Sequence, residues 1–198
     1  MKLRIIEKNE YKTIAEIHLV AFKDFFLTSL GKRFLRVYYR ASLKSRESLS
    51  VCGTDEEGKI QGFCIGCVKS KGYHKRLLMN NFFLFLFEGL IVIFSKPASL
   101  VRLVKNMDKI ASSNDDGNYA ELLSIAVSPY QKGFGLGKQL MYKFEEEATK
   151  NGCKRIALTT DYFNNQNVLS FYEKAGYVIY YEFTAFPNRR MYKLIKDL

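Results

Sequence analysis

A glycine-rich run in the second half of the chain separates a strand-like segment from a helix-like one. It covers residues 127–138 and reads Val-Ser-Pro-Tyr-Gln-Lys-Gly-Phe-Gly-Leu-Gly-Lys. Gly133, Gly135 and Gly137 stand at alternate positions, so the backbone can turn sharply and present successive N–H groups. A helix that begins here adds the positive end of its dipole. The run is therefore predicted to bind a pyrophosphate.

Two common phosphate-binding motifs do not match this run. A Walker loop needs serine or threonine after its Gly-Lys pair and a glycine five residues earlier, but Gln139 follows Lys138 and position 132 is lysine. The dinucleotide fingerprint would require a glycine at position 138. The run therefore belongs to another class of phosphate site.

The run resembles the acetyl-CoA loop of the GNAT superfamily of N-acetyltransferases, V-x-P-x-x-(R/Q)-G-x-G-x-(G/A). Gly135 and Gly137 match its two signature small positions, whereas Lys132 replaces the usual arginine or glutamine. Lysine keeps the positive charge but lacks the planar fork of arginine. Downstream, Asn165 and residues 171–177 resemble the family's N-x(6)-Y-x(3)-G-(F/Y) segment. The resemblance covers residues 119 to about 183.

The resemblance implies that acetyl-CoA is the cosubstrate, and no metal is expected. Ile125, Ala126 and Val127 would pair through their backbones with the pantetheine arm, as an added strand does. Asn165 would help to fix this arm near the thioester. The residues implied to surround the pyrophosphate are Lys132, Gly133, Phe134, Gly135, Leu136, Gly137 and Lys138.

Acetyl transfer to an amine needs an acid, a base and a donor to the oxyanion. Tyr172 matches the family's usual general acid, whose phenol hydrogen-bonds the departing thiolate. A backbone N–H between Ser124 and Val127 is the candidate oxyanion donor.

The base is predicted less directly. Glu121 lies six residues before Val127, where some members of the family place a glutamate base, and an apolar strand is expected to raise its pKa. Asp161 is the reserve candidate. His18 and His74 are interpreted as structural residues.

The resemblance implies an α/β GNAT fold, with a mixed, mostly antiparallel sheet that splays near Val127 and helices on both faces. Apolar periodicity predicts helices over residues 11–22, 27–43, 135–151 and 167–175. Strands are predicted over residues 3–7, 49–54, 60–68, 119–127, 154–160, 177–183 and 190–194. The composition, 47% hydrophobic and 26% charged, suits one domain over residues 1–198.

The segment of residues 69–118 is predicted to be a helical insertion between the third and fourth strands. Residues 82–94 are mostly apolar but too few to span a bilayer, and residues 100–110 form a second helical pattern. Basic residues flank the apolar run. Three roles for residues 77–110 stay open besides simple core packing: peripheral contact with an anionic membrane, homodimer formation, or a cover over the acceptor site.

Charge and cysteine usage limit the partners. The net charge of +11 favours anionic ligands, but the aromatic residues cluster with aliphatic ones, so no nucleic acid partner is expected. The N-terminal residues lack the apolar core of a signal peptide, which predicts a cytoplasmic protein, peripheral to the membrane if residues 77–110 bind it. Cys64 and Cys67 are predicted to face opposite sides of a strand and therefore to share neither a metal nor a disulfide.

These observations favour an N-acetyltransferase, an acyltransferase that acts on a primary amine. Aromatic residues in the N-terminal helices and the long insertion favour a small acceptor such as an amino sugar. Two alternatives stay open: a protein or peptide amine as acceptor, and a non-catalytic acyl-CoA-binding protein.

Overall fold

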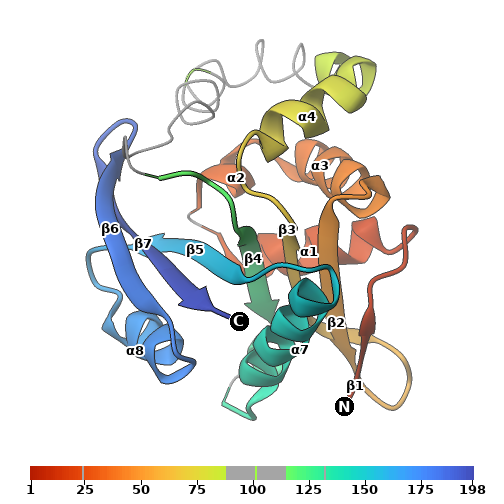
Figure 1. Ribbon diagram of the computed structural model, residues 1–198. Helices are drawn as coiled ribbons and strands as arrows, with labels where there is room; N and C mark the ends of the chain where they lie inside the picture. Colours follow the sequence, from red (N-terminus) through yellow and green to blue (C-terminus); the bar gives the residue numbers. More distant parts are fainter. Residues whose placement is uncertain (24, 88–100, 102–114, 132) are drawn as a thin grey trace.

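The protein forms a seven-stranded sheet in a computed structural model that describes residues 1–23, 25–87, 101, 115–131 and 133–198 (Figure 1). The strand order is β1-β2-β3-β4-β5-β7-β6, and every pair is antiparallel except β4 with β5. The strands are β1 Lys2–Ile5, β2 Ser48–Thr54, β3 Ile60–Cys67, β4 Ala120–Val127, β5 Arg155–Asp161, β6 Val178–Ala185 and β7 Arg189–Asp197. The predicted mixed, mostly antiparallel sheet is confirmed.

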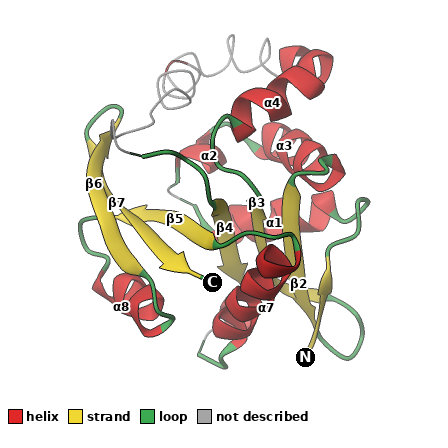
Figure 2. Cartoon of the chain, viewed as in Figure 1, coloured by secondary structure: helices red, strands yellow, loops and turns green. Residues whose placement is uncertain are grey.

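Helices cover both faces of the sheet (Figure 2). On one face α1 and α3 pack over an apolar core that includes Ile14, Leu35 and Phe63, and on the other α7 and α8 pack over a core that includes Leu140 and Phe144. The described helices are α1 Tyr11–Ala21, α2 Phe26–Ser29, α3 Lys32–Lys44, α4 Tyr73–Asn80, the 3₁₀ turn Pro129–Gln131, α7 Leu136–Lys150 and α8 Gln166–Lys174. Helices are needed on both faces because strands such as β3 carry side chains that are buried on both faces of the sheet.

The two cysteines of β3 lie on opposite faces, as predicted. Cys64 packs in the core under α7, whereas Cys67 packs in the core under α1 and α3. Both thiols are free and buried. Among the described residues, no group of three or more His, Cys, Asp or Glu side chains is arranged to hold a metal ion.

The single helix predicted over residues 27–43 is wrong. Two helices, α2 and α3, occupy this stretch because Gly31 lies between them with a φ of 94°. A positive φ is costly for other residues and interrupts an α-helix. After the break, Phe34, Leu35 and Tyr39 of α3 pack in the core on this face of the sheet.

The insertion after β3 begins with α4, and residues 82–87 are also helical. Phe83 and Phe87 are exposed there, while Phe85 is buried. The rest of the predicted helix 82–94 and most of residues 100–110 lie outside the described residues, so the roles of residues 77–110 stay predictions. No helix among the described residues is both long and apolar enough to cross a membrane.

Candidate active site

The strands β4 and β5 pair over only three residues. Residues 120–122 match residues 156–158, and beyond them the strands diverge (Figure 1). They diverge because β3 keeps pairing with β4 as far as Val127 while β7 keeps pairing with β5 as far as Asp161. A cavity of about 620 Å³ opens at this splay. The resemblance implied a splay near Val127, and in the structure the strands part after Leu122.

One extra residue bends β4 where the strands part. The neighbouring residues Ile65 and Gly66 of β3 stand opposite Ser124 and Leu122, so Leu123 is the extra residue of a bulge. Bulges bend strands and redirect the groups beside them. Leu123 and Ser124 both line the cavity, together with the predicted arm-binding residues at positions 125–127.

The N-terminus of α7 presents N–H donors at this cavity that have no partner among the described residues. No side chain caps the helix, and the first intrahelical bond of this terminus runs from the Gln139 N–H to the Gly135 carbonyl over 3.1 Å. The N–H groups of Leu136, Gly137 and Lys138 precede that bond, and the helix dipole adds partial positive charge. This arrangement suits a phosphate.

The glycines before α7 leave space in front of these donors. Gly133 and Gly135 have φ values of 86° and 79°, and a Cβ added to either would meet no atom within 4 Å. The side chain of Leu136 is buried in the core and that of Phe134 is exposed, while the Lys138 ammonium lies 5.5 Å from the centre of the Tyr142 ring. A phosphate bound here would therefore meet backbone groups rather than these side chains, and Lys132 lies outside the described residues.

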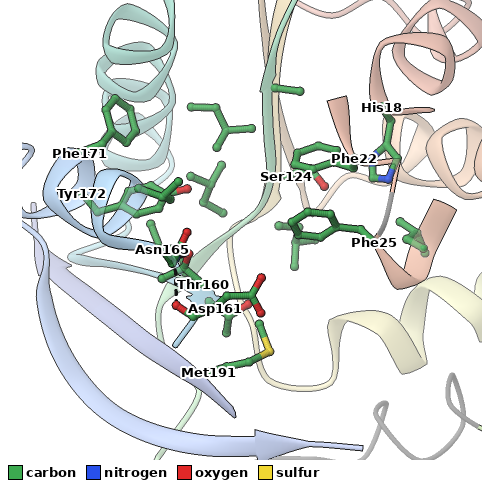
Figure 3. Close-up of a pocket in the computed structure, with 18 of the residues that line it drawn as sticks. His18, Phe22, Phe25, Ser124, Thr160, Asp161, Asn165, Phe171, Tyr172 and Met191 are labelled. Atoms are coloured by element: carbon green, nitrogen blue, oxygen red, sulfur yellow. Dashed lines mark hydrogen bonds between the residues drawn. The ribbon is translucent and has the colours of Figure 1, made fainter. Parts of the chain in front are cut away.

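Residues of α8, together with Asn165 just before it, form the cavity wall that lies opposite α1 (Figure 3). Tyr172 is buried, and this burial raises its pKa, so its hydroxyl keeps its proton at neutral pH. The side-chain amide of Asn165 donates to Thr160 Oγ1 at 2.6 Å and to the Asp161 carbonyl at 2.9 Å. Asn165 thus ties the end of β5 to the start of α8, and its predicted contact with the pantetheine arm stays a prediction.

The expectation that the pKa of Glu121 is raised is wrong. Burial alone would raise it, but the Lys193 ammonium 2.5 Å away and the Ser70 hydroxyl at 2.5 Å lower it below its ordinary value. Glu121 is not among the residues that line the cavity. Its carboxylate stabilises the buried Lys193 ammonium. A lowered pKa makes Glu121 a weaker base, whereas a general base needs a raised pKa.

Asp161, the reserve candidate for the base, lies in the cavity wall in a bidentate ion pair. Arg189 Nε is 2.5 Å from one carboxylate oxygen and a terminal nitrogen is 2.6 Å from the other. The same guanidinium lies 5.0 Å from the centre of the Phe25 ring. Each carboxylate oxygen thus accepts a hydrogen bond from the guanidinium, and Asp161, Arg189 and Phe25 form one side of the cavity.

His18 belongs to the site, although the sequence indicated only a structural role. It is 3% exposed and lines the cavity beside Phe22 (Figure 3). Its Nδ1 lies 2.6 Å from the Tyr39 hydroxyl, while its Nε2 is buried without a partner in the described part of the chain. Its position on α1, four residues from the buried Ile14, is the sequence signal that it faces the sheet.

Burial lowers the pKa of His18 to about 4, which makes the stability of the protein depend on pH. The unfolded chain takes up a proton near pH 6.5 and the folded chain does not, so stability falls as pH falls. Between pH 7.5 and pH 5 this group is expected to remove about 2 kcal/mol. Chemical denaturation across this range should show the loss in the wild type, and His18→Asn should lack this component. Equal pH dependence in the two proteins would contradict the assignment.

The family comparison matches most of the chain. Residues 12–177 match the model of the acetyltransferase (GNAT) family, so the match contains the splay, the glycine run and Tyr172. A search of curated proteins gives no match.

Solved structures of other acetyltransferases share the fold, among them the three that follow. An aminoglycoside 6'-acetyltransferase type Ii aligns with a TM-score of 0.64 at 14% identity, over 100% of this chain and 97% of that one. The ribosomal-protein-S18-alanine N-acetyltransferase from Escherichia coli gives 0.63 at 14%, over 99% and 92%. The PaiA N-acetyltransferase from Thermoplasma acidophilum, in complex with coenzyme A, gives 0.58 at 15%, over 100% and 98%. The chain belongs to the acetyltransferase (GNAT) family.

Proposed function

We propose that the protein transfers an acyl group, in the simplest case acetyl, from coenzyme A to a primary amine. The observation that carries this proposal is the meeting of the β4–β5 splay with the uncapped, glycine-lined N-terminus of α7. The cosubstrate supplies an activated acyl thioester. The family and the coenzyme A-bound neighbour support this assignment.

Backbone groups hold the cosubstrate in this proposal. The N–H groups of Leu136, Gly137 and Lys138 bind the pyrophosphate, and the open space at Gly133 and Gly135 accommodates it. Ile125, Ala126 and Val127 offer the edge of β4 that β5 leaves unpaired to the pantetheine arm. A backbone N–H at the bulge of β4 stabilises the oxyanion.

Tyr172 and His18 act on opposite sides of the reacting carbon. Tyr172 donates its hydroxyl proton toward the leaving sulfur, since burial keeps this phenol neutral. His18 accepts a hydrogen bond from the amine at Nε2, while its Nδ1–H donates to the Tyr39 hydroxyl. The amine attacks directly in a ternary complex, because the described residues that line the cavity include no cysteine.

We propose a small-molecule amine, such as an amino sugar, as the acceptor. The cavity wall on the acceptor side is aromatic, from Phe22, Phe25 and Phe26, with Asp161 and Arg189 beside it. Relatives of this fold are named for both kinds of acceptor, an aminoglycoside and a ribosomal protein alanine. A screen that follows free coenzyme A thiol over amino sugars, polyamines and peptides tests the proposal. Turnover with peptides only would overturn the small-molecule assignment.

Replacing Gly135 with valine should weaken coenzyme A binding about 30-fold by calorimetry, because the side chain enters the phosphate space and costs one charge-assisted hydrogen bond of about 2 kcal/mol. Gly152→Val is the matched control. Gly152 follows α7, has a φ of 76°, and a Cβ there also meets no atom within 4 Å. Both variants carry similar backbone strain, but only Gly135 lies at the site. Equal affinity in the two variants would show that the cradle is misplaced.

A further inference from the structure

A second cavity lies beside the first, on the face of the sheet that α1 and α3 cover. It has a volume of about 260 Å³, is partly open, and is lined by side chains of α2, α3 and α4, by Phe85, and by two residues of β4. Phe26, Leu27, Leu123 and Ser124 line both cavities. The two spaces therefore meet at the bulge of β4.

The second cavity suits an uncharged, apolar group. Its described walls include Phe34, Leu77 and Leu78, and none of its described lining residues carries a formal charge at neutral pH. Burial is the largest influence on His74 and lowers its pKa, so its imidazole is neutral. An ammonium group would find no counter-charge in this space, and its desolvation would be costly.

The position of this cavity indicates which substrate it receives. In the proposed reaction, the reacting carbonyl lies at the bulge of β4, and Tyr172 approaches it from α8. The acceptor amine is polar, and the larger cavity offers it the polar wall formed by Asp161 and Arg189. The remaining substituent on the carbonyl carbon is the acyl chain, and the second cavity opens at the bulge where that carbon lies.

We infer that the second cavity is an acyl-chain pocket and that the protein accepts medium-chain acyl-CoA donors. This inference rests on the proposed function. A water molecule takes up about 30 Å³ in the liquid, and a methylene group is of similar size, so a cavity of about 260 Å³ holds at most roughly eight or nine carbon atoms. In the transfer, the amine nitrogen bonds to the acyl carbon and loses one proton to solvent, and the C–S bond breaks with its electron pair on sulfur. The sulfur takes up a proton from Tyr172, and the phenol regains one from solvent, so that it is neutral again at the end of the step.

Calorimetry with coenzyme A, acetyl-CoA, hexanoyl-CoA, octanoyl-CoA and dodecanoyl-CoA tests the pocket without knowledge of the acceptor. Each buried methylene strengthens binding by up to about fourfold. Hexanoyl-CoA or octanoyl-CoA is therefore expected to bind at least about tenfold more tightly than acetyl-CoA. Dodecanoyl-CoA should lose this gain because its chain exceeds the pocket.

Leu78→Trp fills the pocket and should weaken hexanoyl-CoA binding by about tenfold while leaving acetyl-CoA binding unchanged. The matched control is Met79→Trp, the same new side chain on the exposed side of α4, where Met79 is 65% exposed. Leu78→Phe is the milder second variant if Leu78→Trp fails to fold, as judged by thermal melting.

The outcomes separate the two proposals. Tight acetyl-CoA binding with no gain for longer chains would overturn the acyl pocket and leave the proposed function standing. A Leu78→Trp protein that changes only the KM of the acceptor would assign the cavity to the acceptor and also overturn it. Failure to bind any coenzyme A species would overturn both.

Discussion

Replacing Tyr172 with phenylalanine is expected to lower kcat about 10³-fold with little change in the Kd for coenzyme A. The substitution removes the hydroxyl that protonates the leaving sulfur but keeps the ring that packs against Phe171 and Tyr177. Positioned proton transfer contributes about 10²- to 10⁴-fold to such reactions. Steady-state kinetics with the acceptor from the thiol-release screen, combined with calorimetry, measures both quantities.

Tyr177→Phe is the control for this variant. Tyr177 is buried in the same apolar core, 5.9 Å from Tyr172 between ring centres, but it does not line the cavity. Removing the Tyr177 hydroxyl should leave kcat within about twofold of the wild-type value. A Tyr172→Phe enzyme that retains full kcat would remove this residue from the mechanism.

Glu121→Gln is expected to destabilise the protein by about 3 to 5 kcal/mol at pH 7. The variant leaves the Lys193 ammonium, whose side chain is 6% exposed, without its counter-charge. The pKa of Glu121 is lowered in the folded protein, so its contribution is present above the ordinary value of 4.5 and is lost as pH falls through the lowered folded value. Urea unfolding at pH 7 and at several pH values below 4.5 should therefore show a large difference between the two proteins that shrinks as the pH falls.

Two further variants define the cause of this loss. Glu121→Gln combined with Lys193→Met removes both charges and should recover part of the stability, because no unpaired charge remains buried. Glu182→Gln breaks the exposed pair with Arg190, whose side chain is 45% exposed, and should cost under about 1 kcal/mol. A loss for Glu121→Gln no larger than that for Glu182→Gln would contradict the account of a buried ion pair.

Local signals made the cofactor side of the site predictable from sequence. The glycines at 133 and 135 favour the turn before α7 through their own backbone freedom. Tyr172 was predicted from the resemblance of Asn165 and residues 171–177 to a family segment, and it lies on α8. The opposite orientations of Cys64 and Cys67 follow from the two-residue period of a strand. These features depend on neighbours within a few residues.

Features that depend on distant partners were not predictable. The pKa of Glu121 is controlled by Lys193, 72 residues later, and His18 is held by Tyr39, 21 residues away. The Leu123 bulge depends on the register with β3, which no local pattern encodes. The sequence shows a glycine at position 31, but a glycine can lie inside a helix or at its end. Only its positive φ in the structure shows that it ends the helix here.

The three-residue pairing of β4 with β5 gives this sheet an internal edge. Beyond Leu122, one side of β4 lacks a strand partner among the described strands, as the outermost strand of any sheet does. Outer edges invite pairing with other molecules and promote aggregation. Here Tyr172 of α8 and His18 of α1 line the space beside the open side of β4, so a strand from another molecule must displace helices to reach it. On this arrangement, the proposed ligand arm would meet a hydrogen-bonding edge that the flanking helices shield from intermolecular sheet growth.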